Sequence, residues 1–152
     1  MTMKRIILSI LIITIVYMVQ GLVYAGPSAE SGGPPLGKWQ FIGEDDKGVS
    51  WSGILKVQKL DTSLFDADRF HSMFILNATF ADSSYGVEAP CKWDPFKREV
   101  SFGTGNAAFT SILSPDGKSL TQGKWTESER DHRTRKATVT RTGNWSAKFI
   151  SP

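Results

Sequence analysis

Much of the chain alternates apolar with polar side chains, which is the pattern of a β-strand with one buried face. In residues 49–59 the odd positions carry apolar or small side chains until lysine ends the run: Val49, Trp51, Gly53, Leu55 and Val57. Residues 38–43 alternate in the same way, with Trp39 and Phe41 as the apolar members. The acidic segment 44–48 separates the two runs and ends in glycine. We therefore predict a β-hairpin over residues 38–59.

Further strands follow along the chain. Residues 70–80 carry apolar side chains at both parities, which predicts a long strand covered on both faces for part of its length. Residues 61–68 before it fit either one helical turn or an irregular loop. The sequence Ser114-Pro115-Asp116-Gly117 predicts a tight turn, because proline and glycine supply the backbone angles it needs. The remaining predicted strands are 85–93, 98–102, 107–113, 119–126, 135–141 and 145–150.

The pattern amounts to eight or nine short strands and no long helix beyond the N-terminal region. Such spacing favours an all-β fold over alternating βαβ units. Since nearly every connection is short enough to join neighbouring strands, we predict a small antiparallel up-and-down β-barrel of about eight strands. A closed barrel also removes the exposed strand edges on which sheets aggregate.

Residues 1–25 have the layout of a secretory signal peptide. Lys4 and Arg5 precede an apolar run over residues 6–19, and Val23-Tyr24-Ala25 resembles a cleavage site. The alternative is an uncleaved anchor, because residues 6–25 are just long enough to span a bilayer as a helix. We expect cleavage, export to the periplasm or the medium, and a mature form that does not span a membrane.

The mature chain is then expected to have two parts. Residues 26–36 are rich in glycine, proline and serine and show no periodicity, which predicts a flexible arm. Residues 37–152 make up the barrel domain, and their length suits one domain with its own core.

Export also changes the charge. The chain has 18 basic and 15 acidic residues. Without Lys4 and Arg5 the balance falls to 16 basic against 15 acidic, a net charge of +1. No basic stripe interleaved with aromatic residues remains, so we exclude nucleic acid as a partner.

Candidate chemistry is sparse. Cys91 is the only cysteine, so the chain has no internal disulfide; we expect a small buried side chain, with an intermolecular disulfide as the alternative. His71 and His132 lack the spacing of a metal site, and no catalytic or cofactor motif is found. We expect no enzyme, metal or cofactor, although a hydrolase built on carboxylates stays open. The charged segment 127–136 fits a solvated hairpin or a polar recognition loop at the barrel mouth.

The pattern Gly-x-Trp occurs three times, at residues 37–39, 123–125 and 143–145. Glycine permits close approach of two backbones, and tryptophan fills the space beside it. The first copy resembles the Gly-x-Trp signature that opens lipocalin and avidin-type chains, the calycin barrels. That resemblance implies that Trp39 packs across the closed end of the barrel beneath a basic residue, for which Arg141 is the candidate. Gly37 and Trp145 complete the expected closure set, and the later copies are interpreted as barrel packing.

A second resemblance concerns the arm. Secreted inhibitors of bacterial metalloproteases are barrels of similar size that carry a flexible segment ahead of Gly-x-Trp. Ser28-Ala29-Glu30 before Gly37-Lys38-Trp39 looks similar to that arrangement. The resemblance implies that residues 26–36 would enter a protease cleft.

The aromatic residues bear on function as well as packing. Eight-stranded barrels hold either a core of side chains or one small ligand. We therefore predict a non-catalytic binding module for a small hydrophobic or ring-bearing molecule, with a secreted or periplasmic protein as the alternative partner. The candidate ligand-lining residues are Trp51, Trp93, Trp125, Phe74 and Tyr85.

Overall fold

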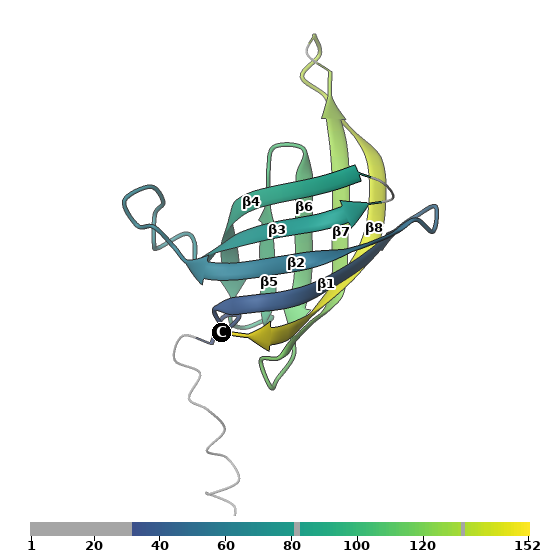
Figure 1. Cartoon of the computed structure of the whole chain (residues 1–152). Helices are drawn as coiled ribbons and strands as arrows, with labels where there is room; N and C mark the ends of the chain where they lie inside the picture. Colours follow the sequence, from purple (N-terminus) through teal and green to yellow (C-terminus); the bar gives the residue numbers. More distant parts are fainter. Residues whose placement is uncertain (1–31, 81–82, 132) are drawn as a thin grey trace, which may run out of the picture. The chain divides into compact units, whose positions relative to one another are not determined.

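The computed structural model describes residues 32–80, 83–131 and 133–152, and residues 32–152 form one compact unit. It is a closed antiparallel barrel (Figure 1). Its strands are β1 (Gly37–Asp45), β2 (Ser50–Lys59), β3 (Ser72–Phe80), β4 (Ser83–Asp94), β5 (Glu99–Gly103), β6 (Ala107–Leu113), β7 (Ser119–Arg130) and β8 (Ala137–Ser151).

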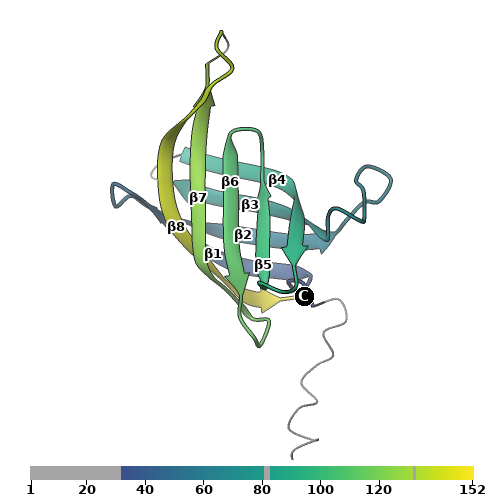
Figure 2. The same cartoon turned by 180° about the vertical axis from the view of Figure 1, so that it is seen from behind.

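Each strand pairs with the next one in sequence, and β1 pairs with β8 to close the sheet. Figure 2 shows β5 to β8 from the side that lies behind in Figure 1. The predicted fold class, an all-antiparallel up-and-down barrel of eight strands, is confirmed. The described residues contain no helix. The predicted signal peptide and residues 26–31 of the predicted arm lie outside the described residues.

The C-terminal region contains one strand where the sequence suggested two. The sequence predicts separate strands over residues 135–141 and 145–150, yet β8 runs without a break from Ala137 to Ser151. Gly143 is paired on both sides, with Asp45 of β1 and Trp125 of β7. Pairing to two neighbours holds the glycine in the strand.

The segment between β2 and β3 is a loop. Backbone bonds from Phe65 N to Asp61 O and from Phe70 N to Asp66 O, each 3.1 Å long, close two separate turns. The Asp61 carboxylate accepts the Ser63 amide at 2.9 Å and so stabilises the first turn locally. Neither turn continues into a helix.

The middle of the barrel is a packed core. Side chains at alternate strand positions point inward, and Phe74, Phe109 and Leu76 are at most 1% exposed. The rings of Phe102 and Phe109 stack with centroids 4.8 Å apart, and Phe74 lies 4.8 Å from Phe102. Because these rings fill the middle of the barrel, a ligand would have to bind nearer one end.

One end, which we call the floor, is closed by the first strand and the segment before it. The Trp39 indole donates to the Pro35 carbonyl at 3.2 Å and packs edge-on against Phe149 at 5.3 Å. Pro34 is fully buried. Within the described part of the predicted flexible arm, Pro34 is thus packed at the floor, whereas Gly32, Pro35 and Leu36 are exposed.

The later two Gly-x-Trp copies form a reciprocal pair. In the β7–β8 register Gly123 is opposite Trp145, and Trp125 is opposite Gly143. A Cβ on Gly123 would lie 2.7 Å from the Trp145 ring, and one on Gly143 would lie 2.3 Å from Trp125 Nε1. Each tryptophan therefore covers the glycine of the other copy, which explains why both positions lack a side chain.

Candidate binding site at the mouth of the barrel

A cavity of about 360 Å³ lies at the end of the barrel opposite the floor, which we call the mouth. The ends of β1, β3 and β7 and the starts of β2, β4 and β8 lie at this end (Figure 1). The cavity is lined by aromatic, hydroxyl and charged side chains: Trp51, Phe80, Ser83, Ser84, Tyr85, Trp125, Glu127 and Arg141.

Trp51, at the start of β2, is the centre of the aromatic lining. Its ring makes edge-on contacts with Trp125 at 5.1 Å, Tyr85 at 5.6 Å and Phe80 at 5.9 Å. Trp51 and Phe80 are directly opposite in the β2–β3 register. Contacts of this geometry stabilise aromatic pairs beyond the area they bury, so the lining is held in one arrangement.

Arg141 brings charge to the same cavity. Its guanidinium nitrogens lie 3.6 Å from Asp45 Oδ2 and 3.6 Å from Glu127 Oε2. Its guanidinium carbon lies 3.9 Å from the centroid of the Phe80 ring and 5.8 Å from that of Trp125. Each ion pair engages one terminal nitrogen of a guanidinium group that has five N–H donors, so the pairs position the cation and leave donors for a ligand.

The two carboxylates differ in their surroundings. The Asp45 side chain is buried, and its Oδ1 accepts the backbone amides of Val49 at 2.8 Å and Lys47 at 2.9 Å. These bonds, that to Val49 foremost, together with Arg141, lower the pKa of Asp45 from its ordinary value of 3.8. The Glu127 side chain is 26% exposed, so it can meet a ligand directly.

Tyr85 contributes a phenol hydroxyl whose pKa is shifted by its surroundings at the mouth. Burial raises the pKa of Tyr85 above its ordinary value of 10.0, and the charge of Glu127 raises it further. The phenol is therefore protonated at neutral pH, when it can donate a hydrogen bond as well as accept one.

Two indole donors at the mouth have no protein partner. The Nε1 atoms of Trp51 and Trp125 are buried and form no hydrogen bond with any described residue. Trp39 and Trp145 differ, because they donate to Pro35 O and to Lys124 O at 3.2 and 3.0 Å. Unsatisfied buried donors are uncommon in folded proteins, which sets the two mouth indoles apart.

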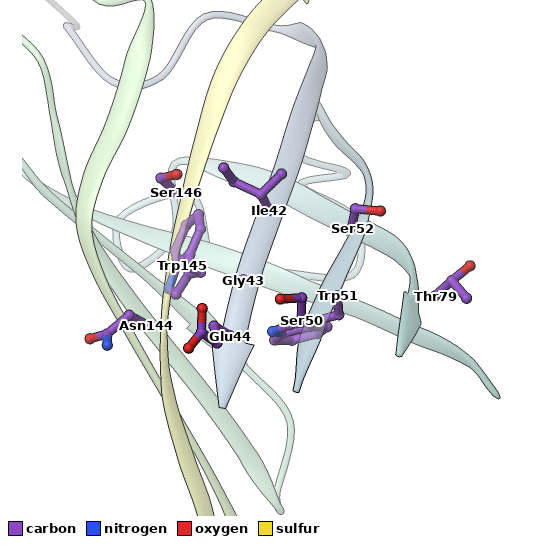
Figure 3. Close-up of a pocket in the computed structure, with 10 residues that line it drawn as sticks. All are labelled: Ile42, Gly43, Glu44, Ser50, Trp51, Ser52, Thr79, Asn144, Trp145 and Ser146. Carbon is purple, nitrogen blue, oxygen red and sulfur yellow. The ribbon is translucent and has the colours of Figure 1, made fainter. Parts of the chain in front are cut away.

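A larger hollow of about 640 Å³ lies on the outer face of β8, β1 and β2 (Figure 3). Ile42 is at its centre, opposite Ser146 on one side and Ser52 on the other. The indoles of Trp51 and Trp145 at its base are only 4% exposed. A ligand there would lie against an open outer surface, so we take the smaller and more enclosed aromatic mouth cavity as the candidate site.

Of the five predicted ligand-lining residues, the structure brings Trp51, Trp125 and Tyr85 together at the cavity. Phe74 does not reach it, because that ring is fully buried in the central core. Trp93 lies near the end of β4, away from the mouth, and packs against the core. Phe74 and Trp93 both face the inside of the barrel, as predicted, but neither lies at the level of the mouth.

The four residues that were expected to close the barrel do not all lie at the same end of it. Gly37 approaches β8 so closely that a Cβ would lie 2.2 Å from Ser151 O, and Trp39 fills the floor beside it. Trp145 stacks on Phe41 at 5.4 Å. The expected pairing of Arg141 with Trp39 is wrong: Arg141 contacts Asp45, at the opposite end of β1 from Trp39.

Several mouth residues were missed by the sequence reasoning. Phe80 is the last residue of the predicted strand over residues 70–80, and its position at the end of β3 was a usable signal. Glu127 belongs to the charged segment 127–136, for which a recognition loop was one of two predictions, but the sequence named no partner for it. Ser83 and Ser84 gave no signal, because serine is common in turns.

The remaining chemical groups do not form a site. Cys91 is buried, and burial raises its pKa to about 12, so the thiol is unreactive at neutral pH. No three metal-ligating side chains cluster within residues 32–80, 83–131 and 133–152. Within the same residues no helix is long and apolar enough to cross a membrane.

No protein-family model matches the chain, and no curated protein matches it. A solved structure described as "Structure of EF1p2_mFAP2b bound to DFHBI" resembles it with a TM-score of 0.50 and 12% sequence identity. The match covers 83% of this chain and 100% of the other. At that identity the likeness concerns the fold alone. It fits a lipocalin-like barrel, and membership of the calycin families remains a hypothesis.

Proposed function

We propose that this chain is an exported, non-catalytic binding protein that holds one small, apolar, ring-bearing molecule at the mouth of its barrel. The observation that carries the proposal is the mouth cavity itself, which combines a wall of aromatic rings with a few polar groups. Ligand sites in proteins have this composition, and their volumes start at ~300 Å³. The cavity of about 360 Å³ thus suits a small ligand.

Two further facts support the proposal. The similar solved structure, which shares only the fold, is bound to DFHBI. The sequence of residues 1–25 is the basis for export. No metal or cofactor enters the proposal, since the aromatic rings and Arg141 supply the contacts by themselves.

The alternative, a protease inhibitor that acts through residues 26–36, gains no support from the described part of that segment. Pro34 is buried, and Pro35 accepts the Trp39 indole. Pro34 and Pro35 would have to leave the floor before they could enter another protein. A deletion of residues 26–31 that abolished protease inhibition would favour this alternative over ligand binding.

The test is calorimetric titration of the purified protein with four ring compounds of one size. They are naphthalene, 2-acetylnaphthalene, 2-naphthoate and 2-naphthylmethylammonium. We expect at least one to bind with a stoichiometry of one. Tyr85→Ala should weaken that binding about fivefold, because it removes one aromatic contact worth ~1 kcal/mol.

Phe96→Ala is the matched control, because Phe96 is 98% exposed in the β4–β5 turn and should leave binding unchanged. Native mass spectrometry of the protein as purified would show whether a ligand is carried over. A protein that is empty as purified and binds none of the four compounds would contradict the proposal.

A further inference from the structure

The charges at the mouth restrict the ligand more than the aromatic rings do. Glu127 and Arg141 are the charged residues that line the cavity. Asp45 stands behind them and pairs with the same guanidinium. Two carboxylates therefore share one cation, so the cluster carries a net charge of −1 when all three groups are ionised.

An anionic ligand would be poorly matched to this cluster. It would have to approach Arg141, the basic residue of the cavity lining, whose nitrogens already lie 3.6 Å from each of two carboxylates. Like charges at such short range repel, and the anion would also lose its hydration on entering a half-buried site.

A cationic ligand meets the opposite obstacle. The Phe80 face that could hold it is occupied by Arg141 at 3.9 Å, and Glu127 is already paired with that arginine. The Phe80 face and the Glu127 carboxylate are thus already engaged by a cation of the chain itself. A second cation would face the guanidinium at close range.

A neutral hydrogen-bond acceptor fits what remains. The Arg141 side chain is 33% exposed, and its two ion pairs cannot use all five N–H donors of the guanidinium. The Tyr85 hydroxyl, protonated at neutral pH, is a further donor in the same lining. We infer that the mouth selects neutral, planar ring compounds that direct a carbonyl or similar acceptor at Arg141.

This inference rests on the proposed function, and the order of affinities within the naphthalene series tests it separately. We expect 2-acetylnaphthalene to bind about tenfold more tightly than 2-naphthoate or 2-naphthylmethylammonium, a difference of ~1.4 kcal/mol. Naphthalene, which lacks an acceptor, should bind more weakly than the ketone. If either ion binds as tightly as the ketone, the inference is wrong while the proposed function stands. If nothing binds, the proposed function itself fails.

Two variants test the role of the charges. Glu127→Gln removes one of the two carboxylates that repel an anion, so the preference for the ketone over 2-naphthoate should fall about tenfold through a gain by 2-naphthoate. Arg141→Met keeps the length of the side chain without its donors, so the preference for the ketone over naphthalene should fall about tenfold.

Glu129→Gln is the matched control, because Glu129 is an exposed glutamate two positions further along β7 and outside the cavity lining. It should leave the whole series unchanged. Far-ultraviolet circular dichroism would verify that each variant keeps the barrel. A folded Glu127→Gln variant with unaltered affinity for 2-naphthoate would overturn the inference.

Discussion

The floor and the mouth of this barrel are both built around tryptophan, but the surroundings of the indoles differ. At the floor Trp39 is fully buried, its N–H donates to Pro35 O, and its ring packs on Phe149. At the mouth Trp51 and Trp125 have no protein acceptor, and their rings border a cavity. Three charged residues meet beside that cavity and none is described in contact with Trp39.

The difference shows how one residue type serves closure at one end and recognition at the other. A bulky ring whose polar atom is satisfied by its own chain adds stability and excludes everything else. A ring beside a cavity, next to an arginine with unoccupied donors, offers contacts to a second molecule. The predictions that follow should separate these two roles.

The largest loss of stability is expected from a substitution at the floor. Trp39→Ala removes a fully buried ring and leaves the Pro35 carbonyl without its donor, so unfolding should require ~3–5 kcal/mol less free energy. Urea unfolding followed by circular dichroism measures this loss. Tyr85→Ala at the mouth removes a half-buried ring and should cost less stability but more affinity. A variant that kept its fold without Trp39 but lost all ring binding would contradict the division of roles.

A smaller loss of stability is expected when Gly143, which lies beneath Trp125 at the mouth, is substituted. A Cβ on Gly143 would lie 2.2 Å from Glu44 O and 2.3 Å from Trp125 Nε1, so the backbone or the indole must move. Gly143→Ala should destabilise the protein by ~1–3 kcal/mol and shift the Trp125 fluorescence. Gly105→Ala is the control, since no atom lies within 4 Å of its Cβ position. Equal stability of the two variants would show that the tryptophan does not depend on the bare glycine.

The smallest effect is expected on the pH dependence of stability, to which Asp45 at the mouth contributes. Because the pKa of Asp45 is lowered in the folded protein, its contribution to stability is present above its unfolded pKa of about 3.8 and is lost as the pH falls through the folded value. Urea midpoints measured from pH 7 to pH 3 should therefore fall less steeply for Asp45→Asn than for the wild type.

Other lowered carboxylates act in the same direction and must be separated from Asp45. Asp61 is one of them, and its partner is the exposed Ser63 of the β2–β3 loop. Asp61→Asn therefore shows how much of the slope comes from loops. If Asp45→Asn kept the full wild-type slope, the Asp45–Arg141 pair would have no role in acid stability.

The fold could be predicted because its signals are local. Alternation assigned Trp39, Phe41, Trp51 and Leu55 to one face, and each is buried inside the barrel. Short connections between strands implied that neighbours in sequence are neighbours in space, which the strand order confirms. The candidate site was predicted only in part, because alternation says which face a residue occupies and not how far along the barrel it lies.

Strand β7 shows a second limit. Leu120 and Trp125 are both buried inside the barrel although one position is even and the other odd. The pairing with β8 shifts between Leu120 and Gly123, and Gln122 in that interval has a φ of 53°. A bulge of this kind inserts an extra residue and reverses the parity beyond it. Nothing in the local sequence marks Gln122 for that conformation.

The sequence by itself determined the all-β class, the number of strands to within one, and the inward face of most of them. These follow from a period of two and from turn residues, which act over a few positions. Only the tertiary structure decided that Arg141 belongs to the mouth and Trp93 to the core, and that two Gly-x-Trp copies cover each other. Those outcomes depend on register between strands far apart in the chain, which closure of the whole barrel sets.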